Sequence, residues 1–173
     1  MLELVDVLQI IEKRADETKD YPSPLRVDPQ EFGVTLIGPN DEDFIPAIQA
    51  AITARHPRAR VCIATFPKGG KGDKLRLLLG ALLNTVGRPA PTRTQPTDEL
   101  MLQVSLLMAQ KTDFLIVDNA EYLNLPCLHF LRRDRGMVPA LLVGRNKRFF
   151  QTLASDPTLN RRALVVDSPI LGG

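Results

Sequence analysis

The sequence contains few cysteines and histidines and no long apolar run. Cys62 and Cys127 are its only cysteines, and both stand in apolar surroundings, which does not make a disulfide framework or a metal site. Neither His56 nor His129 stands at the sequence spacing of metal ligands or of a catalytic triad. Without a run of about 18 apolar residues the sequence has no candidate membrane span. These absences argue against a disulfide-stapled, metal-binding or membrane-spanning protein, and they leave two free thiols in a reducing compartment.

The amino-terminal residues do not resemble a targeting signal. The opening segment, MLELVDVLQIIEKRADE, carries acidic residues among its apolar ones and lacks a basic start. Secretory signals have the opposite arrangement. We therefore expect a cytoplasmic protein, and its 173 residues suit one domain with a substantial core.

Charge is unevenly distributed along the chain. Residues 1–60 hold 7 Lys and Arg against 11 Asp and Glu, whereas residues 61–173 hold 15 against 9. A basic half of this kind permits contact with nucleic acid without establishing it.

Residues 1–32 read as a segment separate from the core. Leu4, Val5, Leu8 and Ile11 recur at helical spacing, which predicts an amphipathic helix over residues 2–18. Packing of this helix on its own domain is favoured over packing on a partner. Three prolines within Tyr21–Gln30 predict an extended connector.

Residues 33–173 alternate between apolar strands and helices. Five strands separated by helices predict a three-layer α/β fold with a parallel sheet and helices on both faces. The predicted strands are Val34–Ile37, Arg60–Phe66, Asp113–Val117, Val138–Val143 and Ala163–Val166. The predicted helices are Phe44–Arg55, Asp73–Val86, Thr97–Gln110, Leu125–Arg133 and Phe149–Ala154.

The first strand and the segment after it have the layout of a phosphate-binding loop, G-x-x-x-x-G-K-[ST]. Gly38 stands at the first glycine of that pattern. Asp43 occupies the second glycine position, Phe44 the lysine position and Ile45 the Ser/Thr position. The strand–loop–helix frame is present, and the residues that hold phosphate and magnesium are missing.

The third strand and its continuation, DFLIVDNAEYL, resemble a Walker B strand closed by Asp118. Together with VGRP, FLRR, VPALLVG and DPTLNRR, in that order, the chain resembles the AAA+ ATPases of transposition, the TniB and MuB-like group, over roughly residues 33–168. In working members the aspartate holds Mg²⁺ and the next residue is usually a glutamate that orients the attacking water. Here the next residue is Asn119.

The departures from the family pattern predict loss of ATP hydrolysis. Asp41, Glu42 and Asp43 stand where phosphate would bind, and one carboxylate about 4 Å from a phosphate charge costs about 4 kcal/mol at an effective dielectric of 20. A helix terminus returns only roughly 0.3–2 kcal/mol. Asp43 instead fits the N-cap of a helix that tolerates Pro46 in its first turn. We therefore expect no cofactor and no metal, with ATP and Mg²⁺ bound only under an alternative reading.

Two further family features bear on assembly. The resemblance places Arg162 where an arginine can reach a neighbouring subunit's nucleotide, and without nucleotide a surface or interface salt bridge is favoured. The sequence ends seven residues after Val166, so the helical lid that normally follows this core is not expected.

A second loop, Lys68–Lys74 (KGGKGDK), lies between a predicted strand and helix and resembles the K-G-G-x-G-K-[ST] loop of ParA-type ATPases. Asp73 occupies its lysine position and Lys74 its Ser/Thr position, which argues against nucleotide binding. Two readings stay open: a solvated basic loop, or a loop that contacts nucleic-acid phosphates. The candidate nucleic-acid residues are Lys68, Lys71, Lys74, Arg76, Arg132 and Arg133.

The sequence therefore favours a non-hydrolysing AAA+-like module over an enzyme. It would contact DNA, a partner protein or a second copy of itself in transposition or another mobile-element process. Two alternatives remain. One is an ATPase or switch that still binds nucleotide through residues 38–45 or 68–74, and the other is a pure protein–protein interaction domain.

Overall fold

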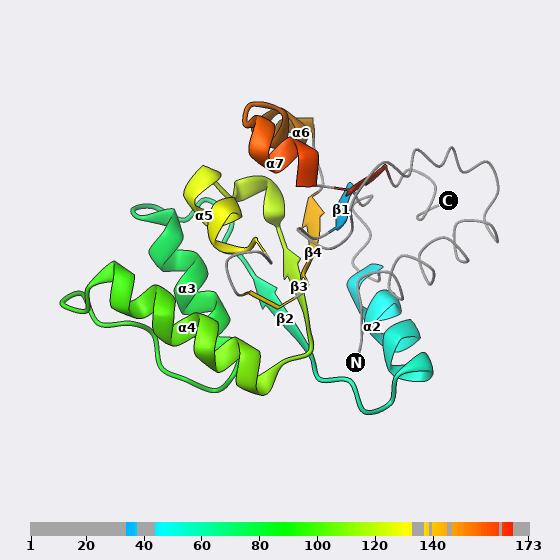
Figure 1. Ribbon diagram of the computed structural model, residues 1–173, viewed down its shortest axis with the longest axis horizontal. Helices are drawn as coiled ribbons and strands as arrows, with labels where there is room; N and C mark the ends of the chain where they lie inside the picture. Colours follow the sequence, from blue (N-terminus) through cyan, green and yellow to red (C-terminus); the bar gives the residue numbers. More distant parts are fainter. Residues whose placement is uncertain are drawn as a thin grey trace.

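The structure, a computed structural model, describes residues 34–37, 44–132, 137–138, 140–144, 147–162 and 164–167. Figure 1 shows these elements along the chain. The strands are β1 (Val34–Ile37), β2 (Val61–Thr65), β3 (Phe114–Asp118), β4 (Ala140–Gly144) and β5 (Leu164–Asp167). The α-helices are α2 (Phe44–Arg55), α3 (Lys74–Thr85), α4 (Thr97–Lys111), α5 (Leu125–Phe130), α6 (Lys147–Ala154) and α7 (Pro157–Arg162), and a 3₁₀ turn, η1, covers Ala120–Tyr122.

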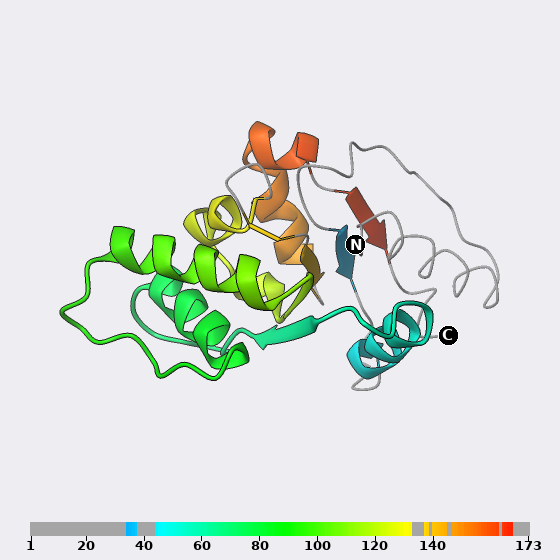
Figure 2. The ribbon, with the colours of Figure 1, turned by 60° about the horizontal axis from the view of Figure 1, so that its bottom comes forward.

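The strands form one sheet in the order β2-β3-β4-β1-β5, and every neighbouring pair is parallel. The predicted α/β fold with a parallel sheet is confirmed. Successive connections move from β2 through β3 to β4, whereas the connection from β1 to β2 runs the other way across the sheet. Since parallel crossovers are right-handed in about 98% of cases, this reversal puts α2 on the face opposite the later helices. Figures 1 and 2 agree in separating α2 from α3 and α4.

One face of the sheet packs against α3 to α7. Every second residue of the central strands points into this layer: Leu115 and Val117 from β3, and Ala140 and Leu142 from β4. Each fully buried aliphatic side chain contributes roughly 1.5–3 kcal/mol relative to exposure. The helices contribute Leu78, Leu79, Leu82, Leu83, Leu100, Val104, Met108, Cys127, Leu128, Phe130, Phe149, Leu153 and Leu159 to the same core.

The alternate residues of the central strands are also buried, which explains their continuous apolar sequence. Phe114, Ile116, Leu141 and Val143 each have 0% exposure, so both faces of β3 and β4 are covered. On α2, Ile45, Ile48 and Ile52 are buried as well.

The helices α3 and α4 run in the same direction, so the chain must return between them. Residues 86–96 make this return without regular structure. Figure 2 shows them running from the carboxyl end of α3 back to the amino end of α4. At Gly80, the loop comes so near that an added Cβ would lie 3.4 Å from Pro91 Cδ. The return loop therefore lies along α3.

Most predicted elements match the structure to within one or two residues, and two short ones were missed. The helix predicted over Leu125–Arg133 stops at Phe130, and η1 and α7 have no counterpart in the prediction. Three and six residues are too short to show helical periodicity. The amphipathic helix predicted for residues 2–18, the connector and the division at residue 32 lie outside the described residues.

No helix within the described residues is long and apolar enough to cross a bilayer.

Candidate functional site

The carboxyl ends of the strands line up along one edge of the sheet. The register pairs Thr65 with Asp118, Asp118 with Val143, and Ile37 with both Gly144 and Asp167. In open parallel sheets, ligands bind outside this edge, near the point where the connections change direction. Here that point lies between β1 and β4, next to the end of β3. This edge is therefore the candidate functional site.

Asn119, directly after β3, closes the β2 end against the β3 end. Its backbone is left-handed, with φ 59° and ψ 37°, and its side chain is 5% exposed. The side-chain amide donates to the carbonyl oxygen of Phe66 at 3.0 Å, and the Phe66 N–H donates to the Asp118 carbonyl at 3.1 Å. Asparagine is one of the few residues that adopts this backbone conformation readily. Asn119 is thus a structural joint between two strands.

Asp118 faces the same joint. Its Oδ1 accepts the N–H of Asn119 at 2.8 Å, and the residue is only partly buried. The chain turns at Asn119 straight into η1, because the Tyr122 N–H donates to the Asn119 carbonyl at 3.1 Å. The turn places Glu121, 6% exposed, near the strand ends.

The basic loop after β2 leads into a helix that carries its own cap. Asp73 is the N-cap of α3, and its Oδ1 accepts the N–H groups of Leu75 at 3.0 Å and Arg76 at 3.3 Å. Because the Asp73 carboxylate already accepts N–H groups of the first turn, fewer of these donors remain to bind an anion. Lys68 and Lys71 precede the cap, are exposed, and make no hydrogen bond or ion pair within the part of the chain that is described.

Two other residues predicted to contact nucleic acid make internal hydrogen bonds. Lys74 is half-buried, and its Nζ donates to the Tyr122 carbonyl at 3.0 Å. Arg76 donates through Nη1 to the Gln95 carbonyl at 2.8 Å and through Nη2 to the Thr92 carbonyl at 2.7 Å. A third bond joins Arg76 Nη1 to Thr97 Oγ1 at 3.2 Å. The structure thus gives Lys74 and Arg76 positions inside the fold, which the sequence did not indicate.

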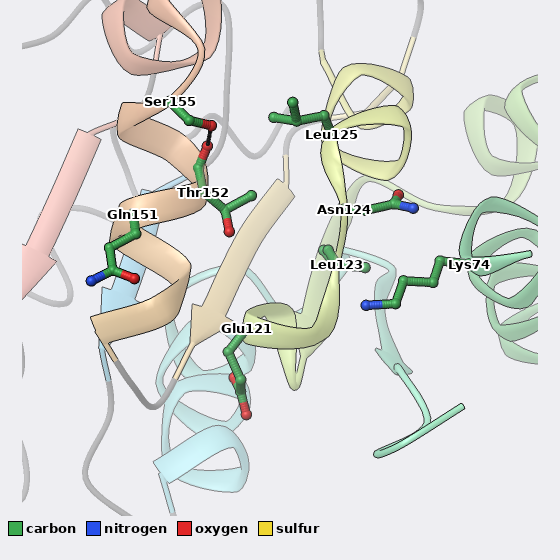
Figure 3. A pocket seen from close by; sticks show the side chains of 8 residues that line it. All are labelled: Lys74, Glu121, Leu123, Asn124, Leu125, Gln151, Thr152 and Ser155. Carbon is green, nitrogen blue, oxygen red and sulfur yellow. Dashed lines mark hydrogen bonds between the residues drawn. The ribbon is translucent and has the colours of Figure 1, made fainter. Parts of the chain in front are cut away.

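A pocket of about 430 Å³, lined by both polar and apolar side chains, opens beside η1 (Figure 3). Lys74 extends into it from α3, and the residues of α6 form the wall across from it. Ser155 on that wall donates to the Thr152 carbonyl at 2.7 Å. The pocket is lined by Lys74, Glu121, Leu123, Asn124, Leu125, Gln151, Thr152 and Ser155. Sequence reasoning missed this pocket because three distant segments form it.

Gly144 brings the α6 wall close to the strand ends. A Cβ at Gly144 would lie 2.6 Å from Phe149 Cδ1, a distance that real side chains do not adopt. Phe149 has 0% exposure and packs in the core.

Arg132, His129 and Asp156 form a chain of hydrogen bonds from α5 to α7. Arg132 Nη1 lies 3.3 Å from His129 Nδ1, and His129 Nε2 lies 2.8 Å from Asp156 Oδ2. Because a guanidinium can only donate, we assign Nδ1 as the acceptor and Nε2–H as the donor to Asp156. Asp156 stands 27 residues from His129 in the sequence, so no local pattern indicated this hydrogen bond. Arg132, a predicted nucleic-acid contact, is only 8% exposed.

Asp156 also starts the last helix of the described chain. Its Oδ1 accepts the N–H groups of Thr158 at 2.9 Å and Leu159 at 3.3 Å. The hydrogen bond from His129 holds the pKa of the Asp156 carboxyl below its usual value, and the two backbone N–H groups act in the same direction.

The burial of Cys127 argues against a reactive thiol at that position. Cys62 and Cys127 are both free, and burial raises the pKa of the Cys127 thiol to about 11. A thiol with that pKa is protonated at neutral pH and is a poor nucleophile. Cys127 packs in the core, and Cys62 is only partly buried.

Several predicted site residues fall outside what the structure describes. Gly38, Asp43 and Arg133 lie outside the described residues, and for Phe44 and Arg162 only the helical backbone is described. Ile45, at the Ser/Thr position of the phosphate-loop pattern, is described and is 7% exposed. Among the described residues there is no cluster of three or more His, Cys, Asp or Glu side chains that could hold a metal ion.

Solved structures place this arrangement in a known fold. Cdc6p from Pyrobaculum aerophilum superposes with a TM-score of 0.60 at 20% identity, covering 92% of this chain and 43% of that one. The chain has an AAA+ fold. The Aeropyrum pernix ORC2 protein in its ADP form matches this chain with a TM-score of 0.58 at 12% identity, over 95% of this chain and 47% of that one.

A chain in the structure of Drosophila ORC bound to GC-rich DNA and Cdc6 has the same AAA+ fold. Its TM-score is 0.54 at 13% identity, over 94% of this chain and 57% of that one. The present chain thus spans about half the length of these proteins. The sequence itself matches no protein-family model and no curated protein.

The Asn119 joint predicts a graded response to substitution. Asn119→Gly keeps the left-handed turn and loses the bond to Phe66, whereas Asn119→Ala also strains the backbone. We expect a loss of about 1–3 kcal/mol in unfolding free energy for the glycine variant and roughly 1 kcal/mol more for the alanine variant. Chemical denaturation measures both.

The glutamate found in working AAA+ proteins should be the least tolerated substitution at position 119. A glutamate would place a carboxylate, which cannot donate, against the Phe66 carbonyl. It also adopts the left-handed backbone conformation less readily than asparagine. Asn84→Ala, an exposed change on α3, is the control and should stay within about 0.5 kcal/mol of the parent. Equal stability of Asn119→Glu and the parent would contradict the structural role of Asn119.

The lowered pKa of Asp156 predicts a specific pH dependence. Its carboxylate stabilises the fold above the ordinary aspartate pKa of about 4, and this contribution disappears as the pH falls through the lowered folded-state pKa. Asp156→Asn removes the charge but keeps a residue that caps helices well. The variant should be less stable than the parent at pH 7, and the difference should shrink as the pH is lowered from about 5 to about 3.

Thermal unfolding across that pH range measures the difference. In a His129→Leu background, the Asp156→Asn change should have a smaller effect at pH 7, because the partner is already absent. A difference that stays constant with pH would show that the carboxylate charge contributes nothing.

Proposed function

We propose that this chain is a non-hydrolysing AAA+-like module that contacts DNA through the basic loop after β2. The observation that carries the proposal is Asn119. Where a hydrolysing AAA+ protein has a glutamate to orient water, this chain has a buried amide that donates to the Phe66 carbonyl. An amide cannot accept a proton as a general base, and its orientation is fixed by the strand joint.

The two candidate phosphate loops support the same proposal. Ile45 takes the position of the hydroxyl that would hold Mg²⁺, and it is buried. At the second loop, Asp73 caps α3 with its own carboxylate, at the place where a ParA-type loop would offer its lysine. A phosphate at either helix start would therefore lack a lysine at the position expected of its motif.

The lysines of the second loop supply the proposed DNA contact. Lys68 and Lys71 are exposed, and Gly69 and Gly72 between and after them have positive φ angles of 66° and 99°. A glycine-rich turn allows a phosphate backbone to come close, and each lysine adds an ionic contact. One fold relative, Drosophila ORC, was solved bound to DNA and to Cdc6.

The setting rests on resemblance alone. The order of motifs over residues 33–168 resembles the TniB and MuB-like transposition group, which suggests a mobile-element process with a protein partner or self-association. The ADP form of the Aeropyrum pernix ORC2 protein supports the main alternative, a chain that still binds nucleotide. A pure protein–protein interaction domain is the second alternative.

A DNA shift assay over a salt series tests the proposal. The double variant Lys68→Glu and Lys71→Glu should bind DNA more weakly than the parent. The slope of log affinity against log salt should become shallower by about 0.9 for each lost phosphate contact with duplex DNA.

The matched control reverses two charges elsewhere. Arg88→Glu with Lys111→Glu alters two exposed residues near the carboxyl ends of α3 and α4, away from the basic loop. This control should leave the affinity and the salt slope nearly unchanged. Equal binding by the parent and the loop variant would remove the basic loop from the account and favour the interaction-domain alternative.

A further inference from the structure

Two loops meet at the first turn of α3. The basic loop packs on it: a Cβ at Gly70 would lie 2.8 Å from Leu77 Cδ1 and 3.4 Å from Pro67 Cγ. The return loop of residues 86–96 is hydrogen-bonded to Arg76 in the same turn. The first turn of α3 therefore fixes both loops in relation to each other.

Arg76 holds the end of the return loop that lies near the start of α4. Its guanidinium binds the carbonyls of Thr92 and Gln95 and the hydroxyl of Thr97, three acceptors within six residues. A hydrogen bond from a charged donor to a carbonyl is about twice as strong as a hydrogen bond between two neutral groups. The segment between these acceptors is thereby held at the first turn, although it has no regular structure.

Arg93 lies within the segment that Arg76 holds. It is exposed and makes no hydrogen bond or ion pair in the described chain. Its neighbour Thr92 is bonded to Arg76, so the backbone that carries Arg93 is positioned rather than free. The two lysines of the basic loop precede the same turn along the chain and are exposed as well.

We propose that Arg93 is a third phosphate contact, and that the basic loop and the return loop together grip one nucleic-acid backbone across the start of α3. Lys68 and Lys71 approach the phosphates from one side and Arg93 from the other. Arg76 acts as a positioning residue for Arg93 and does not contact the phosphates. This inference rests on the proposed DNA contact of the basic loop.

Acidic residues at the starts of α3 and α4 weaken the electrostatic potential of these cations. Asp98 and Glu99 are exposed in the first turn of α4, next to Thr97, and Asp73 caps α3. The arrangement does not form a broad positive patch, so the contacts are made by individual side chains. Replacing Asp98 and Glu99 by their amides should therefore strengthen DNA binding.

Arg88 provides a matched comparison within the same loop. It is exposed like Arg93, but its N–H donates to the Leu83 carbonyl at 3.0 Å, at the far end of α3. A helix of 12 residues extends about 18 Å, which puts Arg88 well away from the first turn. The same charge reversal at the two positions separates local contact from a general effect of charge.

The experiment measures binding of duplex DNA by Arg93→Glu, Arg93→Lys and Arg88→Glu in the full chain over a salt series. Arg93→Glu should weaken binding roughly fivefold at low salt and reduce the salt slope by about 0.9. Arg93→Lys should retain most of the affinity, and Arg88→Glu should match the parent. Both arginines are exposed, and circular dichroism melting confirms that each variant folds.

The lysine variant distinguishes this inference from the proposed function. If Lys68→Glu with Lys71→Glu weakens binding while Arg93→Glu behaves like Arg88→Glu, the two-loop grip is wrong and the basic-loop contact stands. If neither the lysine variant nor Arg93→Glu weakens binding, both are wrong. Weaker binding in both, with an unchanged Arg88→Glu, supports the grip.

Discussion

The hydrogen bond from the Asn119 amide to the Phe66 carbonyl is the constraint on which the functional edge of this fold depends. It closes the end of β2 against the end of β3 through a left-handed residue, and it sends the chain directly into η1. The same turn supplies the Tyr122 carbonyl that receives Lys74 from α3. The strand end, the 3₁₀ turn and the first turn of α3 are therefore joined by a few polar contacts at one place.

The proposed function gives the residue after the strand-end aspartate a structural role. In the AAA+ pattern the residue after the strand-end aspartate orients the attacking water. Here that residue, Asn119, donates a hydrogen bond to the backbone of the neighbouring strand. The helix start beyond the second loop is capped by Asp73, and the hydroxyl position of the first loop is a buried isoleucine. Each of these departures from the motifs has its own structural explanation. The exposed Lys68, Lys71 and Arg93 are the groups proposed to bind an outside polyanion.

The sheet was accessible from the sequence, whereas the polar contacts were not. The apolar run of β3 predicts a strand covered on both faces, and all four of its apolar residues are buried. Asn119 could be recognised as a departure from a motif. The carbonyl that accepts its hydrogen bond belongs to Phe66, 53 residues away, and no local sequence pattern shows this contact. The sequence suggested that Arg76 is a surface cation. Its hydrogen bonds to residues 92–97 form only because α3 and α4 pack parallel to each other, and the sequence does not show that packing. His129 and Asp156 meet only once α5 and α7 are in place.

Isothermal titration calorimetry of the chain with ATP and Mg²⁺ tests the central claim, that a structural joint has replaced nucleotide chemistry at the strand ends. The account predicts no saturable heat at millimolar ATP, and no release of phosphate on prolonged incubation. Saturable binding in the micromolar range would contradict it, and would assign the edge to a working nucleotide site.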